Sequence, residues 1–178
     1  MRVLSETTAI AKAHELKREL QTIIREQYEH RAKSCLTCET KGACCLDAHF
    51  VNVRITRLEA TAIRNVINSL PEPELEKVRE RITNVIEKFD LSDDPLVEKT
   101  YACPLFEPNI GCLVHEQGKP LPCIVHACYE NRKDLPPEDL LEKYESKVDD
   151  LNQRAYGSKA VHLSLPIAVS NAMKKQTS

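Results

Sequence analysis

Apolar residues recur every three or four positions over four long stretches of the chain, which predicts four amphipathic helices. We place these helices at about residues 5–33, 56–70, 73–90 and 137–156. Thr56 and Glu59 form a capping box at the start of the second helix, and Gly157 is a suitable stop for the fourth. The short connection between the second and third helices contains a proline and predicts that they pack as an antiparallel hairpin.

The rest of the chain carries little regular pattern. Residues 50–55 alternate enough for a very short β segment, and 161–165 alternate and should pack against the core. From Tyr101 to Cys128 the chain is rich in proline and cysteine and has no helical period. We therefore expect a mostly α protein, with helices packed around an irregular cysteine-rich core. Residues 1–178 fit a single domain, with a flexible tail at 173–178.

The first predicted helix, 5–33, is long for a chain of this size and has two interpretations. Its apolar stripe is most simply a core-packing face opposite a solvated charged face. The alternative is a helix that binds a protein partner or dimerises. The sequence favours the first interpretation and leaves the oligomeric state open.

Composition argues against two classes of partner. The net charge is −2, aromatic residues make up 4% and tryptophan is absent, so neither nucleic acid nor an anionic membrane is expected to bind. No apolar run reaches the roughly 20 residues that span a bilayer, and the first residues lack the pattern of a signal peptide. We expect a cytoplasmic, reducing setting, in which clustered cysteines bind metal more often than they form disulfides.

Eight cysteines are the chain's main chemical signal, and all lie within residues 35–128. They form a compact first group and a wider second group: Cys35, Cys38, Cys44 and Cys45, then Cys103, Cys112, Cys123 and Cys128.

The first group contains a metal knuckle, Cys35-x2-Cys38, whose thiolates can turn onto one ion. A redox pair has the same spacing, but no βαβ pattern surrounds it here. The adjacent Cys44 and Cys45 diverge, so they suit two metals, or one sulfur that bridges two. We therefore interpret the two groups as halves of one shared site. Two four-thiolate centres, a polynuclear zinc cluster and one or two iron–sulfur clusters all remain open.

Other residues near the cysteines could support such a site. Gly42 and Gly111 can expose backbone amides that donate to sulfur. His115 and His126 are candidate further ligands, although the sequence favours a thiolate-only set. Three cations could offset thiolate charge: Lys41, Arg54 and Lys119.

The combined cysteine pattern resembles the YkgJ family, a zinc- or iron-chelating domain. The shared features are a Cys-x2-Cys block that ends in a vicinal pair, the segment from Val53 to Ala60, a Cys-Pro element at Cys103, a Gly-Cys element at Cys112, and a final Pro-x-x-Cys at Cys123 followed by Cys128. The chain departs from the family where Lys119 and Ile124 replace arginines, and where the spacer between Cys38 and Cys44 is longer.

The resemblance implies metal binding, by zinc or iron, without an agreed reaction. One alternative is an iron–sulfur or metal-dependent enzyme of redox or group-transfer chemistry. Protein methyl transfer is included because flagellin lysine methylases have a related cluster. Another is a zinc-stabilised protein-interaction module. Hydrolase motifs are absent from the sequence, and a cysteine nucleophile paired with His126 is less favoured than metal ligation. The sequence leaves open whether the protein is an enzyme.

Overall fold

The computed structural model describes residues 3–33, 38–40, 42–46 and 51–175. The protein is mostly helical, as predicted, with 57% of the described residues in helices. The helices are α1 Glu6–Gln27, α2 Ala43–Leu46, α3 Arg57–Ile67, α4 Glu72–Lys88, α5 Leu121–Val125, α6 Glu138–Tyr156 and α7 Leu165–Lys174. The described residues also include the 3-10 turns η1 Glu29–Arg31 and η3 Arg132–Asp134.

The strands are very short and pair in three separate antiparallel ladders. β1 Ala32–Lys33 pairs with β5 Cys128–Tyr129, β2 Arg54–Ile55 with β6 Leu163–Ser164, and β3 Phe106–Glu107 with β4 Gly111–Cys112. Each strand has two residues, so these ladders tie distant segments together and do not form a sheet layer.

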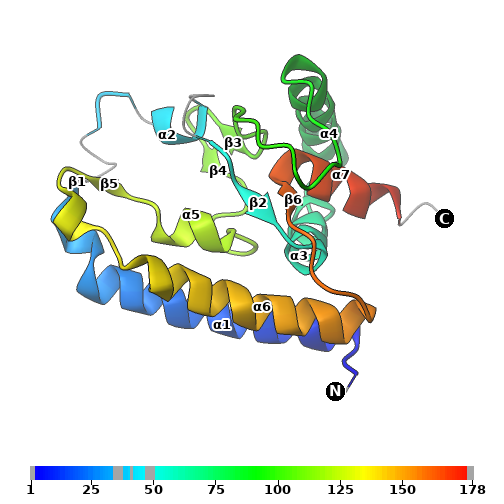
Figure 1. Cartoon of the computed structure of the whole chain (residues 1–178). Helices are drawn as coiled ribbons and strands as arrows, with labels where there is room; N and C mark the ends of the chain where they lie inside the picture. The colour runs from blue at the N-terminus through cyan, green and yellow to red at the C-terminus, as the bar shows by residue number, and fades with distance from the viewer. Residues whose placement is uncertain (1–2, 34–37, 41, 47–50, 176–178) are drawn as a thin grey trace.

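The two longest helices, α1 and α6, lie side by side and run in opposite directions (Figure 1). Tyr156, at the end of α6, donates to Glu6 at the start of α1 at 2.8 Å. Nearer the other end, the Tyr144 hydroxyl donates to Glu19 at 2.7 Å. These two hydrogen bonds fix the antiparallel register along the pair.

The apolar stripe of α1 is buried inside the chain, which agrees with the core-packing interpretation. Its residues face α6, α5 and α3, and the buried positions are Ala9, Ala13, Lys17, Leu20 and Ile24. The helix ends earlier than its sequence pattern suggests, at Gln27 rather than at 33. The η1 turn and strand β1 take up the residues that follow.

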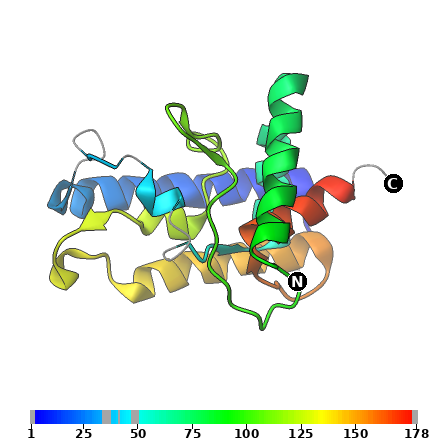
Figure 2. The ribbon, with the colours of Figure 1, turned by 90° about the horizontal axis from the view of Figure 1, so that it is seen from above.

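α3, α4 and α7 form the second helical part, which stands beside the α1–α6 pair (Figures 1 and 2). The capping box at Thr56 and Glu59 is present at the start of α3, as predicted. α7 packs against both α3 and α4, whereas the direct contact between α3 and α4, both fully described, is slight. The two helices therefore do not pack directly on each other as expected, and α7, a helix that the sequence pattern did not predict, packs against both of them.

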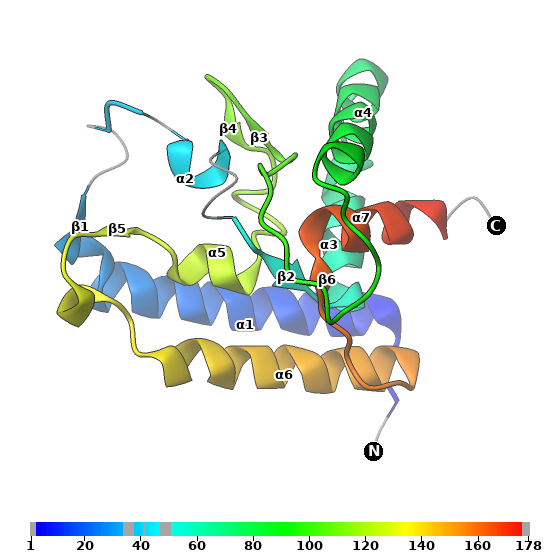
Figure 3. The ribbon, with the colours of Figure 1, turned by 45° about the horizontal axis from the view of Figure 1, so that its top comes forward.

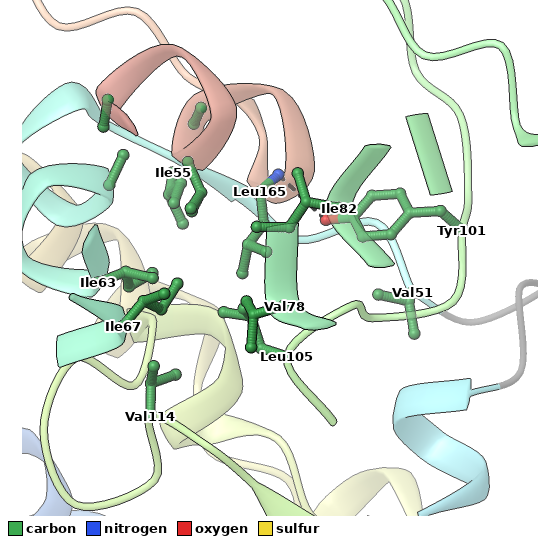
Figure 4. Close-up of a cluster of buried hydrophobic side chains, with 14 of the residues drawn as sticks. Val51, Ile55, Ile63, Ile67, Val78, Ile82, Tyr101, Leu105, Val114 and Leu165 are labelled. Atoms are coloured by element: carbon green, nitrogen blue, oxygen red, sulfur yellow. Dashed lines mark hydrogen bonds between the residues drawn. The ribbon is translucent and has the colours of Figure 1, made fainter. Parts of the chain in front are cut away.

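The largest hydrophobic cluster lies among α3, α4, α7, β2 and the segment 101–114. Tyr101 is completely buried in it and points toward the start of α7 (Figure 4). Its hydroxyl donates to the Val53 carbonyl and accepts from the Leu165 amide at 3.2 Å. Tyr101 thus joins the cysteine-rich segment to β2 and α7.

The cysteine-bearing elements lie on one side of the α1–α6 pair (Figure 3). α5 packs against α1 and α6, and α2, β3 and β4 are seen beyond it (Figure 3).

Met173 and Lys174, assigned to a tail from the sequence, belong to α7, and residues 176–178 lie outside the described part. Over the described residues, no helix has the length and apolarity needed to cross a membrane.

Candidate metal centre

Seven of the eight cysteines lie in the described part of the chain, and none of these seven forms a disulfide. Cys35 lies outside it. The others occur on short elements or next to them: Cys38 before α2, Cys44 and Cys45 in α2, Cys103 before β3, Cys112 in β4, Cys123 in α5 and Cys128 in β5.

The two cysteine groups of the sequence meet at a backbone hydrogen bond. The Cys103 amide donates to the Cys45 carbonyl at 2.7 Å. The same junction contains Gly42, two residues before Cys44, and Phe106, three residues after Cys103. The structure therefore brings the start of the second group against the end of the first.

Gly42 is required at this junction for two reasons. Its φ is +84°, which side chains disfavour, and a Cβ atom there would lie 2.1 Å from Cζ of Phe106. The Phe106 ring thus packs directly on the Gly42 backbone. The sequence suggests amide donation to sulfur at Gly42, whereas the structure shows that this glycine lets Phe106 approach the backbone.

Five thiols form one electrostatic neighbourhood, which we call the central cysteine group: Cys44, Cys45, Cys103, Cys112 and Cys123. Burial raises the pKa of Cys45 well above its usual value, and the thiols of Cys44, Cys103 and Cys123 raise it further. Burial likewise raises the pKa of Cys123 to about 12, with smaller contributions from Cys103 and Cys112.

Cys38 and Cys128 belong to a different neighbourhood, which we call the outer pair. Lys33 is the register partner of Cys128 in the β1–β5 ladder. Oε1 of Glu130 lies 2.7 Å from Nζ of Lys33 and raises the pKa of Lys33. The thiols of Cys128 and Cys38 contribute in the same direction. Both cysteines of the outer pair are thus near Lys33.

Backbone amides point at two sulfurs of the central cysteine group. Burial raises the pKa of Cys103 to about 11, although hydrogen bonds from the amides of Leu105 and Phe106 act in the opposite direction. Burial also raises the pKa of Cys112, against a hydrogen bond from the Val114 amide. These donors follow each cysteine by two or three residues, and they stabilise the thiolate form because they bind the charged sulfur most strongly.

One of the three cations named from the sequence acts on thiols of the central cysteine group. This cation, Lys119, works to lower the pKa of Cys112 and Cys123 against the larger effect of burial. Arg54 is instead committed to the carbonyls of Pro95, Val97 and His162. Lys41 lies outside the described residues.

Arg81 is a second cation near the site, and the sequence analysis missed it. It acts on Cys103 in the same sense as Lys119 acts on Cys112, and its Nη1 donates to Glu107 at 3.0 Å. Its Nε and Nη2 atoms are buried and have no hydrogen-bond partner among the described residues. Arg81 lies in the apolar-patterned α4, remote from any cysteine in sequence, so no sequence signal marked it.

The side chains of the two candidate histidines make no described contact with the central cysteine group, although the backbone amide of His115 donates to the Cys112 carbonyl at 3.1 Å. His115 and His126 both have exposed side chains. Partial burial and then Lys119 lower the pKa of His126, which favours the neutral imidazole that can ligate a metal. Whether either histidine is a ligand stays open.

The donor set fits a thiophilic metal in its chemistry, because soft thiolates suit zinc and iron–sulfur clusters. As they stand, no three Cys, His, Asp or Glu side chains in the described ranges are arranged to hold one ion. The assignment of all eight cysteines as ligands therefore stays a prediction.

Fold and site together define a mostly helical protein with a half-buried cysteine group at the junction of two chain segments. No family model matches the chain, and no curated protein or solved structure is significantly similar to it. The resemblance to the YkgJ family consequently rests on the sequence motifs alone, which are the cysteine pattern and the segment from Val53 to Ala60.

Proposed function

We propose that the chain is a metal-binding protein that holds zinc or iron through cysteine thiolates. The central cysteine group is the main site in this proposal. The outer pair, with Cys35 three residues before Cys38 in the sequence, provides ligands for a second centre. All eight cysteines remain ligands, divided between two centres.

The observation that carries the proposal is the hydrogen bond from the Cys103 amide to the Cys45 carbonyl, which brings the two cysteine groups together. Nearby amides favour the thiolate forms of Cys103 and Cys112, yet burial and neighbouring thiols keep these groups protonated in the absence of a cation. A bound metal ion supplies the missing positive charge, and Lys119 and Arg81 add to it. The arrangement therefore suits thiolates that a cation completes.

Zinc and iron would supply different chemistry at this site. Structural zinc would stabilise the irregular segment from Tyr101 to Cys128, because its binding energy is also folding energy. An iron–sulfur cluster would add electron transfer, and with it the alternative of a redox or group-transfer enzyme. The family resemblance supports metal binding in either case, and we propose the chain as a distant relative of the YkgJ proteins.

The test is metal analysis of the full chain after anaerobic purification. Stoichiometric zinc in a colourless protein supports the zinc version. Brown colour, visible absorption and an electron paramagnetic resonance signal after reduction support the iron–sulfur version. A folded, reduced chain that retains neither zinc nor iron, and binds neither when they are added, contradicts the proposal.

A further inference from the structure

Glu59 has a second role that its place in a capping box does not reveal. Its side chain is only 3% exposed, and its Oε2 accepts the Thr56 amide at 3.4 Å to close the box. Its Oε1 is used elsewhere: it lies 2.9 Å from Lys17 Nζ and accepts the Leu121 amide at 3.3 Å. One carboxylate thus connects α3 with α1 and α5.

The helix that donates this hydrogen bond, α5, has no cap of its own. α5 is five residues long, and its N-cap residue, Pro120, makes no side-chain cap hydrogen bond. Leu121 is the first residue of α5 and presents the first free N–H of the helix. Pro122, which follows it, has no amide hydrogen to donate. Glu59 satisfies that N–H from another element. Two residues further along α5 is Cys123, a member of the central cysteine group.

Lys17 fixes the carboxylate from the opposite side. Its side chain is 6% exposed, and apart from Glu59 its Nζ has no polar partner among the described residues. The ion pair is therefore fully enclosed between α1 and α3. A carboxylate held in this way has little freedom to release the Leu121 amide.

We propose that Glu59, held by Lys17, is a positioning residue for Cys123: it caps α5 from α3 and so sets where the Cys123 sulfur lies within the central cysteine group. The effect of Glu59 on metal affinity rests on the proposed function. Its effect on the position of the Cys123 sulfur does not depend on that function.

The test compares two double variants of the full chain. Lys17→Met with Glu59→Met removes both charges and every acceptor for the Leu121 amide. Lys17→Met with Glu59→Gln removes the charges but keeps one amide oxygen that can accept. Replacing a buried ion pair by apolar residues of similar volume is often neutral for stability, so both variants should fold.

The first readout is the alkylation rate of each cysteine by iodoacetamide in the reduced, metal-stripped protein, followed by peptide mass spectrometry. In the Met/Met variant we expect Cys123 to react about tenfold faster or more, because α5 opens more often. The Met/Gln variant should show a smaller rise. Cys38 and Cys128 are internal controls and should stay within about twofold of the wild-type rate.

A matched variant separates positioning from general destabilisation. Val169→Ala removes volume from a completely buried position in α7, which does not carry a cysteine. An unchanged Cys123 rate in the Met/Met variant overturns the inference. So does a rise shared equally by all cysteines, or one reproduced by Val169→Ala.

The second readout is zinc affinity, measured by competition with a chelator. We expect the Met/Met variant to bind about 10- to 100-fold more weakly, as is typical when a residue that orients a ligand is lost. If the wild-type chain binds no metal but Cys123 still responds to the substitutions, the proposed function fails and the positioning role stands. If the wild-type chain binds metal and neither readout responds, the positioning role alone fails.

Discussion

Gly42 is the residue at which the two cysteine groups are held together. Phe106 packs on its backbone, and a few residues away the Cys45 carbonyl receives the Cys103 amide. The order of the central cysteine group therefore depends on a position that carries no side chain.

Gly42→Ala is expected to loosen this junction. The added methyl group meets Phe106 and the backbone is strained at positive φ, so we expect a loss of about 2–4 kcal/mol in the free energy of unfolding. Urea denaturation of the reduced protein measures it. Gly157→Ala is the control, because Gly157 has a φ of +72° with nothing within 4 Å of an added Cβ. Equal losses in both variants would show that Phe106 does not matter.

At this scale the sequence predicted the residue types of the site but not their contacts. The cysteines, Gly42 and Lys119 could be named, because spacing and chemistry mark them. The contact of Phe106 with Gly42 and the proximity of Arg81 to Cys103 depend on segments that are far apart in the chain. No local pattern encodes such contacts.

Among the elements, Tyr101 makes the connection on which the irregular segment depends. Its hydroxyl bridges the carbonyl of Val53, just before β2, and the amide of Leu165, the first residue of α7. Both groups would lose a partner if the hydroxyl were removed.

Tyr101→Phe is expected to lower the free energy of unfolding by about 1–3 kcal/mol, because two buried backbone groups lose a hydrogen bond. Urea denaturation monitored by circular dichroism measures the change. Tyr129→Phe is the matched control, since the Tyr129 hydroxyl is buried without a partner among the described residues. The interpretation is wrong if Tyr101→Phe is as stable as Tyr129→Phe.

The four long helices could be predicted because each buries one stripe, and the periodicity of that stripe is visible in sequence. α7 was not predicted, since six of its ten residues are buried and its few polar residues do not mark a helical period. The end of α1 was placed too late because the residues after Gln27 form a 3-10 turn and then β1. Tertiary pairing with β5, which sequence periodicity does not show, ends the helical run.

For the molecule as a whole, the thiols predict how stability depends on pH when metal is absent. Burial raises the pKa values of Cys103 and Cys123 to about 11 and about 12 from an ordinary 9.0. In the unfolded chain these thiols lose their protons near pH 9, while the folded chain retains them. Stability is therefore complete below the ordinary value and is lost as pH rises toward the folded values.

We expect the metal-stripped, reduced chain to lose about 1 kcal/mol of unfolding free energy per buried thiol between about pH 8 and pH 10. Urea denaturation at the two pH values measures this, and comparison with Cys103→Ser separates the thiol contribution from that of the tyrosines, which are about half ionised at pH 10 in the unfolded chain. Cys103→Ser should weaken the dependence. Stability that increases over the same range would show that the thiolate forms are favoured without a cation.

The fold class could be predicted from sequence for the whole molecule, and the described structure agrees with it. The division of the cysteines into a central cysteine group and an outer pair could not be predicted from the sequence. Sequence spacing suggested an early and a late group, whereas Cys45 lies with Cys103 and Cys123, and both Cys38 and Cys128 lie near Lys33. Chain folding, through the β1–β5 ladder and the Cys45–Cys103 hydrogen bond, determines that division.

The most direct test of the account is the metal-to-protein ratio of Cys123→Ser, measured by elemental analysis beside the wild-type chain and Cys128→Ser. The account predicts that the wild-type chain carries zinc or iron and that Cys123→Ser loses the metal of the central cysteine group. Cys128→Ser should retain that metal. A Cys123→Ser protein that folds and keeps the full wild-type ratio would contradict the central claim.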